Sequence, residues 1–304
     1  MNSSLQDKAL GCLLGLAIGD ALGTTLEFRP PGSFPPIDDL VGGGPFNLRP
    51  GQWTDDTSMA LCLAESLIES GFDARDQMTR YLQWRDEGHL SSNGTCFDIG
   101  MTVSSALRTF EQSGEPYSGS TDPYSAGNGS IMRLAPLPIY YAEASKAIHL
   151  SGESSRTTHQ APAAIDACRY LGSLLWGLVH GGASREQVLA PDYHPQQKTW
   201  QLQAEIARIA AGSFKEKEPP AINGSGYVVE SLEAALWAFN KAEDFRHGAL
   251  LAVNLGDDAD TTGAIYGQLA GAYFGLAGIP GDWLEKLAHR PLITDFALKL
   301  IASK

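Results

Sequence analysis

Apolar residues recur at intervals of three and four over most of this chain, the spacing that forms one face of an α-helix. The strongest run extends from Leu10 to Leu22, and a second strong run covers Ala264–Ile279. Each run carries a stripe of glycines at every fourth position: Gly11, Gly15, Gly19 and Gly23 in the first, and Gly263, Gly267, Gly271 and Gly275 in the second. Glycine inside a helix costs about 1 kcal/mol relative to alanine. The stripes therefore predict two central, adjacent helices whose backbones pack very closely.

The same periodicity predicts further helices, and no window shows the period-two alternation of a strand. The predicted ranges are 54–68, 73–85, 101–110, 128–140, 163–179, 200–211, 228–240, 245–255, 283–288 and 293–301. Residues 29–52 and 181–226 are rich in proline, glycine or charge, which indicates surface segments. The chain is predicted to be all-α. Because the motifs on both sides of 181–226 look like parts of one site, we expect one domain over residues 1–304.

Composition indicates the cellular compartment and excludes some classes of partner. The chain has 304 residues, of which 22 are basic and 35 acidic, and the net charge of −13 argues against a nucleic acid or an anionic membrane as partner. Its four cysteines form no Cys-x-x-Cys pair, so we expect neither zinc nor disulfides but a reducing cytoplasm. The early apolar run stops at Asp20 and follows no positively charged segment, so we expect neither a signal peptide nor a membrane span. The sequence does not define the oligomeric state.

Two acidic segments stand at the starts of apolar helices. The first, Gly256–Gly263, contains Asp257, Asp258, Asp260, Thr261 and Thr262. The second contains Thr54, Asp55, Asp56 and Thr57. One aspartate at such a place is explained by capping of the free helix amides, but three are not. Buried carboxylates this close must take up protons or bind cations.

Oxygen ligands of this kind suit Mg²⁺ or Mn²⁺ rather than zinc. Two such cations about 3.5–4 Å apart can grip substrate oxygens and activate a water. The two segments therefore indicate a two-metal hydrolase of a small anionic or polyol substrate, with phosphatase and glycosidase chemistry both open. The sequence contains no Walker loop, no His-Glu-x-x-His and no Gly-x-Ser-x-Gly motif.

Other candidate residues have two interpretations each. Glu27, just past the first helix, is either a solvated surface carboxylate or a functional group. Asp98 precedes the predicted helix at 101, where it either caps the helix or holds a neighbouring site residue in place. The segment Asn128-Gly129-Ser130 is either an ordinary turn or a loop that offers amides to a phosphate. His159 stands next to a proline that starts a helix, where a structural role is the commoner one.

These motifs together resemble the ADP-ribosylglycohydrolase family, which includes the dinitrogenase reductase-activating glycohydrolases. The resemblance runs in order through Gly15–Gly23 with Glu27, Gln52–Thr57, Gly127–Arg133, Thr158-His159 and Gly256–Gly263. It implies an all-α, single-domain orthogonal multi-helix bundle that holds two Mg²⁺ or Mn²⁺ ions. The ligands that it implies are Thr54, Asp55, Asp56, Asp258, Asp260 and Thr261. Asp257 is left out, because the family usually has glycine at that position.

The resemblance also implies an activity and a substrate. The catalytic candidates are Glu27 and Asp56, and the candidates for substrate binding are Gly127, Asn128, Gly129, Ser130, His159 and Asp98. We expect release of ADP-ribose from mono-ADP-ribosylated arginine on a protein, through an oxocarbenium-like transition state. The net charge of −13 favours a cationic guanidinium. Two alternatives are hydrolysis of O-linked ADP-ribose, whether serine-linked or O-acetyl-ADP-ribose, and a non-catalytic ADP-ribose-binding role like that of the crystallin relatives.

Overall fold

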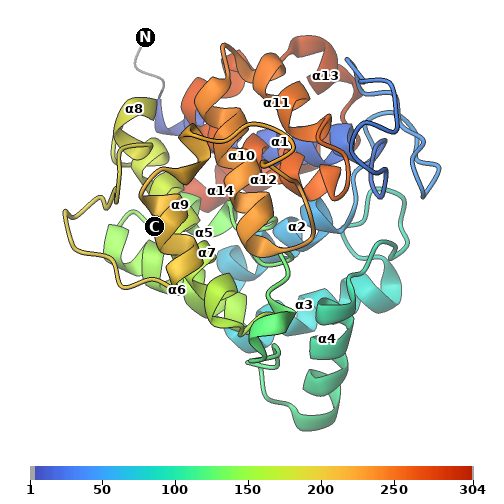
Figure 1. The fold of residues 1–304 in the computed structure, drawn as a ribbon. Coiled ribbons are helices and arrows are strands. Elements are labelled where there is room, and N and C mark those ends of the chain that lie inside the picture. The colour runs from blue at the N-terminus through green and yellow to red at the C-terminus, as the bar shows by residue number, and fades with distance from the viewer. Residues whose placement is uncertain (1–3, 303–304) are drawn as a thin grey trace.

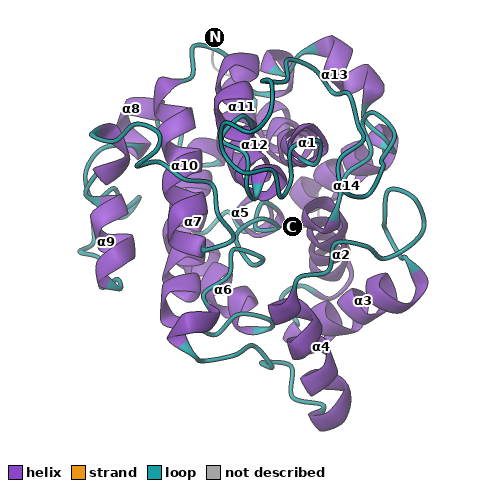
Figure 2. Cartoon of the chain, turned by 45° about the vertical axis from the view of Figure 1, so that its right-hand side comes forward, coloured by secondary structure: helices purple, strands orange, loops and turns teal. Residues whose placement is uncertain are grey.

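The computed structural model describes residues 4–302, and within that range it has fourteen α-helices, three short 3₁₀ turns and no strand (Figures 1 and 2). The all-α prediction is confirmed. The helices are α1 (Leu5–Gly23), α2 (Asp55–Ser70), α3 (Ala74–Glu87), α4 (Met101–Ser113), α5 (Pro136–Tyr140), α6 (Ala144–Arg156), α7 (Pro162–Val179), α8 (Arg185–Val188), α9 (Ala204–Ala210), α10 (Val228–Lys241), α11 (Phe245–Val253), α12 (Ala259–Phe274), α13 (Gly281–Lys286) and α14 (Arg290–Ala302). No helix in the described range is long and apolar enough to cross a bilayer.

The two glycine-striped helices, α1 and α12, form the centre of the molecule and pack along their whole length, as predicted (Figure 1). A methyl group on Gly15 would lie 2.3 Å from the carbonyl oxygen of Gly267, and one on Gly19 would lie 2.0 Å from that of Gly263. Any side chain larger than hydrogen would therefore collide with backbone. The matching positions run in opposite directions along the two helices, so the pair is antiparallel. The end of α1 consequently meets the acidic start of α12.

The remaining helices bury this pair from several sides. Helices α7, α10 and α11 pack on α12, while α14 packs on α1 and α2. The predicted surface segment 181–226 contributes α8, α9 and a few apolar side chains to the same core, among them Val188, Ile206 and Phe214. This shared core supports the prediction of a single domain, which stays a prediction.

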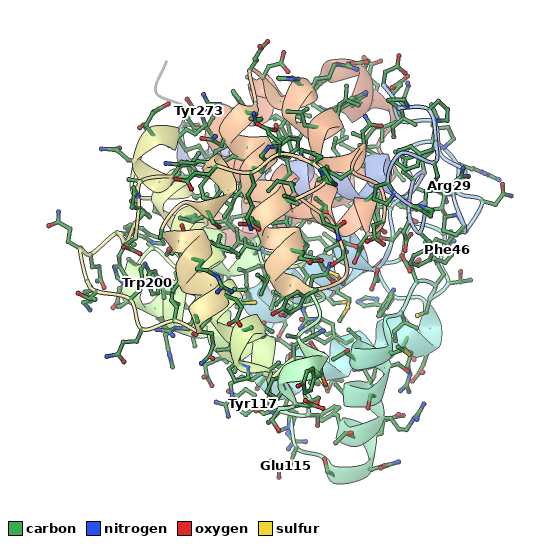
Figure 3. The ribbon with its side chains drawn as sticks, viewed as in Figure 1. Arg29, Phe46, Glu115, Tyr117, Trp200 and Tyr273 are labelled. Atoms are coloured by element: carbon green, nitrogen blue, oxygen red, sulfur yellow. The ribbon has the colours of Figure 1, made fainter. Side chains whose placement is uncertain are left out.

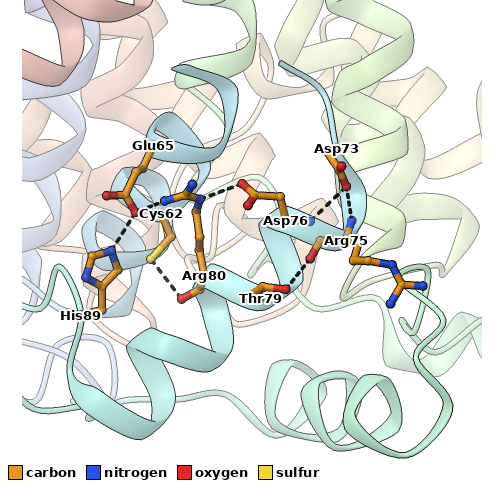
Figure 4. A network of polar contacts seen from close by, with 8 residues as sticks. All are labelled: Cys62, Glu65, Asp73, Arg75, Asp76, Thr79, Arg80 and His89. Carbon is orange, nitrogen blue, oxygen red and sulfur yellow. Dashed lines mark hydrogen bonds and ion pairs between the residues drawn. The ribbon is translucent and has the colours of Figure 1, made fainter. Parts of the chain in front are cut away.

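Helices α3 and α4 are attached to α2 through a second, smaller core that includes Met59, Tyr81 and Trp84. A polar network fixes α3 against α2 (Figure 4). Arg80 on α3 forms ion pairs with Glu65 on α2 and with Asp76, whose Oδ2 is 2.7 Å from its Nε. Through this attachment the start of α4 is placed near the acidic ends of α1 and α12, where it lines a cavity.

The predicted helix at 128–140 is wrong for most of its length. Residues 129–133 form turns, and only α5 is helical. Pro136 and Pro138 lack the N–H groups that a longer helix would need there, and the guanidinium of Arg133 donates a hydrogen bond to the carbonyl oxygen of Gly129. Helix α12 begins five residues earlier than the predicted range and ends at Phe274, followed by the C-cap residue Gly275, whose φ of 72° is left-handed. Helix α6 was not predicted.

Candidate metal centre and substrate cavity

Three buried carboxylates from three helices meet near the C-terminal end of α1. Asp20 of α1, Asp56 of α2 and Asp260 of α12 each offer an oxygen within 4.8 Å of the other two, and none is more than 1% exposed. We call this set the inner triad. Its members lie on the closely packed α1–α12 pair and on the first turn of α2, so their positions are set by helix packing.

Asp20 caps the start of α2, so the acidic side chains there are not needed as caps. The Asp20 carboxylate accepts hydrogen bonds from the N–H of Thr54, at 2.8 Å, and from the N–H and the hydroxyl of Thr57, at 3.0 and 2.5 Å. A residue of another helix thus does what an N-cap side chain normally does. The side chain of Thr54, which occupies the N-cap position, does not cap α2. Asp258, the N-cap residue of α12, makes no side-chain cap either.

A second group of carboxylates shares Asp260 with the first. Glu27, Asp98 and Asp260 offer oxygens within 4.8 Å of one another, and we call them the outer triad. Glu27 lies in the turn after α1 and is only 4% exposed, so it is not a solvated surface carboxylate. Asp98 lies in the loop before α4 with a left-handed φ of 60°, and it does not cap that helix, whose N-cap is Gly100.

The other predicted ligands surround the two triads. The hydroxyl oxygen of Thr54 lies 2.9 Å from Asp20, 3.1 Å from Asp56 and 3.3 Å from Asp260. Asp55, Asp258 and Thr261 line the adjoining cavity. All six predicted ligands therefore come from the two acidic helix starts and gather in one place.

Burial and mutual repulsion give these groups unusual electrostatics. Burial raises the pKa of Asp55, Asp56 and Asp260 well above the usual range, and neighbouring carboxylates raise it further. Burial, with repulsion from Asp98, raises the pKa of Glu27 to about 10. Moreover, Asp56 Oδ1 and Glu27 Oε2 are buried without a hydrogen-bond partner among the described residues. Such a set of close, partly unpaired carboxylate oxygens fits divalent cations that prefer oxygen ligands.

The outer triad opens into a cavity of about 400 Å³. One wall carries Glu27, Asp55, Asp98, Asp258 and Asp260, and another carries Gly127, Asn128, Gly129 and His159. No lysine or arginine is among the described residues that line it. A larger, apolar cavity of about 580 Å³ lies beside α10 and α11, but none of the described residues that line it is a carboxylate. Chemistry rather than size therefore identifies the 400 Å³ cavity as the candidate active site.

The glycine-rich wall is held in shape from behind. A methyl group on Gly129 would lie 2.9 Å from His159 Cε1, so the turn and the imidazole are in close contact. Asn128 Nδ2 donates to Asp258 Oδ2 at 2.8 Å, which ties this wall to the acidic start of α12. Ser130 is the exception among the predicted substrate residues. Its hydroxyl lies 2.9 Å from that of Ser155 in the core, and it does not line the cavity.

The model of the ADP-ribosylglycohydrolase family matches residues 1–304. The chain belongs to the ADP-ribosylglycohydrolase family. Two relatives named ADP-ribosylarginine hydrolase Tri1 are each 45% identical. The one from Serratia proteamaculans (strain 568) matches over 98% of this chain and 80% of its own, and the one from Pseudomonas putida (strain GB-1) over 97% and 78%.

A more distant relative is the ADP-ribosyl-[dinitrogen reductase] glycohydrolase of Rhodospirillum rubrum, 35% identical over 93% of this chain and 91% of its own. A solved structure described as an ADP-ribosylglycohydrolase-related protein complex superimposes with a TM-score of 0.87 at 45% identity. The match covers 99% of each chain. The predicted fold type is therefore that of the ADP-ribosylglycohydrolases.

Two residues of the site, Asp20 and Arg133, are not among those predicted from the sequence. Asp20 is noted in the sequence only as the residue at which the early apolar run stops, although a carboxylate within an apolar, glycine-striped helix must have a buried partner. Arg133 lies in a family motif, yet no role was predicted for it. Arg133 is 1% exposed, and its guanidinium donates to Gly129 O at 3.0 Å and to the Thr158 hydroxyl at 2.7 Å. That hydroxyl lies 2.9 Å from His159 Nδ1.

His159 is consequently a neutral group on the cavity wall. Burial, and then the positive charge of Arg133, lowers the pKa of His159 to about 3. It does not cap the following helix, because the N-cap of α7 is Ala161. Asp257, which was excluded from the predicted ligands, is only half-buried and does not line the cavity.

Proposed function

We propose that this chain is an ADP-ribosylarginine hydrolase, which removes ADP-ribose from mono-ADP-ribosylated arginine on proteins. The observation that carries the proposal is the pair of carboxylate triads that share Asp260 at the head of the 400 Å³ cavity. Family membership supports hydrolysis of an ADP-ribosyl bond, and the names of the two 45% identical relatives support the arginine linkage.

We propose that the site holds two Mg²⁺ or Mn²⁺ ions on Thr54, Asp55, Asp56, Asp258, Asp260 and Thr261. The unpartnered Asp56 Oδ1 and the all-oxygen donor set support this assignment. When bound, such ions polarise substrate oxygens and lower the pKa of a coordinated water. Asp260 is one of the six and also belongs to both triads, so it would hold a cation next to the carboxylates that face the cavity.

The cavity also suggests the direction in which ADP-ribose binds. The terminal ribose would lie against the carboxylates. Its diphosphate would lie against Gly129 and the neutral imidazole of His159, since neither carries a negative charge. Backbone amides and a neutral imidazole N–H donate hydrogen bonds to phosphate oxygens. Arg133 adds positive charge directly behind this wall.

The bond to be broken joins C1 of the ribose to a guanidine nitrogen of arginine. As it breaks, positive charge develops on C1 and the ring oxygen, and the carboxylates of the cavity stabilise that charge. A water oxygen forms the new bond to C1. The departing guanidine keeps the bonding electron pair and takes up the proton that the water releases.

We propose that Glu27 Oε2 carries this proton. Glu27 lines the cavity, and its Oε2 has no other hydrogen-bond partner among the described residues. Asp56, the second catalytic candidate, is fully buried and does not line the cavity. A role in holding a cation therefore suits Asp56 better than a role in moving a proton.

The test is a side-by-side assay of three substrates with the same protein preparation: arginine-linked, serine-linked and O-acetyl-ADP-ribose. We expect release of ADP-ribose from the arginine-linked substrate to be fastest, to require Mg²⁺ or Mn²⁺, and to stop when a chelator is added. Faster cleavage of either O-linked substrate would overturn the arginine assignment. Binding of ADP-ribose without cleavage of any of the three would instead identify a non-catalytic relative.

A further inference from the structure

Phe28 directly follows Glu27, lines the candidate active-site cavity and is 63% exposed. The only other large apolar side chain that lines this cavity and is exposed is Met101, within the described residues. An exposed phenylalanine forgoes on the order of 2 kcal/mol of burial free energy. Its position at the mouth of a polar cavity therefore needs a reason other than folding.

The backbone holds Phe28 in place at a further cost. Its φ of 59° lies in the left-handed region, which bulky residues rarely adopt. The N–H of Phe28 donates to the carbonyl oxygen of Asp257 at 2.7 Å, and the N–H of Asp257 donates to that of Arg29 at 2.8 Å. These bonds connect the turn after α1 to the acidic start of α12. The Phe28 side chain is thus positioned by the same segment that carries the predicted ligands.

Two further rings support the Phe28 ring. Phe46 packs edge-on against it with centroids 6.4 Å apart, and Phe97 packs on Phe46 at 5.2 Å. Phe46 and Arg29 are labelled at the same edge of the view in Figure 3. Phe97 directly precedes Asp98 of the outer triad. The three rings form an aromatic cluster next to the outer triad, and most of the surface of Phe28 remains available for a ligand.

We propose that Phe28 is a specificity-determining residue that stacks on the planar guanidinium of the substrate arginine. The inference rests on the proposed function and names the contact that recognises the leaving group. Glu27 would lie at the bond between C1 of the ribose and the guanidine nitrogen, and its neighbour Phe28 would then contact the guanidinium itself. A planar cation gains from an aromatic face. The adjoining carboxylates of Glu27 and Asp98 favour the same charge.

The test uses two substitutions that separate stacking from apolar contact. Phe28→Leu keeps an apolar side chain without a ring, and Phe28→Tyr keeps the ring. We expect Phe28→Leu to lower kcat/KM on arginine-linked substrate by about 3- to 30-fold, the scale of a cation–π contact. Phe28→Tyr should stay within about 2-fold of wild type. The Kd for ADP-ribose, which lacks the guanidinium, should be unchanged in both variants by calorimetry.

A matched control is Tyr273→Leu, because Tyr273 is a half-buried ring that lies away from Phe46 (Figure 3) and outside both cavities. It should retain wild-type kcat/KM. Equal activity of Phe28→Leu and wild type would overturn the inference alone. Weaker ADP-ribose binding in Phe28→Leu would also overturn it, by placing the ring on the ADP-ribose. A wild-type protein that prefers O-linked substrates would overturn the inference together with the arginine assignment.

Discussion

The inner and outer triads share Asp260 but differ in almost every other respect. The other inner carboxylates, Asp20 and Asp56, project from helices, are fully buried and, in the case of Asp20, are held by hydrogen bonds to the start of α2. The other outer carboxylates, Glu27 and Asp98, come from loops and face the cavity. Similar chemical groups are thus divided into one set fixed by helix packing and one set presented to a ligand.

This difference indicates a division of labour. Groups on rigid helices are suited to hold cations in a fixed geometry, whereas groups on loops beside a cavity are suited to contact the substrate. We therefore expect substitutions in the two triads to have different consequences. A residue shared by both should combine them.

The largest effect is expected from Asp260→Asn. Because Asp260 belongs to both triads, its replacement by a neutral amide should remove high-affinity cation binding and lower kcat/KM by about 10³-fold or more. Calorimetric titration with Mn²⁺ and an assay on arginine-linked substrate measure the two quantities. Far-UV circular dichroism should show wild-type helicity. Normal cation binding by this variant would contradict the assignment of Asp260 as a cation ligand.

The next effect is expected from Glu27→Gln, which changes the outer triad alone. We expect turnover to fall by about 10²-fold or more, the scale of a lost proton-transfer group, while cation stoichiometry and ADP-ribose affinity stay near wild type. Asp98→Asn is the matched comparison within the same triad. If Glu27→Gln retains most of its turnover, the proton is carried by another group and the outer triad has no reactive member at Glu27.

The sequence predicted the helical fold, the contact of the two glycine stripes and the convergence of the two acidic helix starts, because periodicity and spacing are local signals. It did not predict the role of Asp20, since capping of one helix by a side chain of another depends on packing across 34 residues of chain. It could not decide between the interpretations of Glu27, Asp98 and His159. Their burial and partners are set by loops such as the one at Asp98, which adopts a left-handed backbone.

A moderate effect is expected from Asp20→Ala, which changes the inner triad. The start of α2 would lose the acceptor for the N–H groups of Thr54 and Thr57, and such a loss costs about 1–2 kcal/mol. Urea unfolding in the presence of a chelator measures this cost separately from cation binding. Glu27→Gln serves as the control and should show a smaller change under the same conditions. An unaltered midpoint for Asp20→Ala would contradict the capping role.

The smallest effect concerns His159 and acid. The folded pKa of about 3 lies below the ordinary value of about 6.5, so the unfolded chain binds a proton that the folded protein does not. The stability contributed by neutral His159 is thus fully present above pH 6.5 and is lost as the pH falls toward 3. Between pH 7 and pH 5.5 we expect wild type to lose about 1 kcal/mol more unfolding free energy than His159→Gln. Equal losses in both proteins would show that His159 is protonated in the folded state.

Electron paramagnetic resonance of the Mn²⁺-loaded wild-type protein would show whether the site holds two neighbouring cations. Two Mn²⁺ ions about 3.5–4 Å apart interact magnetically. We expect two bound Mn²⁺ per chain and a spin-coupled spectrum that is absent from Asp260→Asn. Saturation with the six-line signal of isolated Mn²⁺ would contradict the proposed two-cation site.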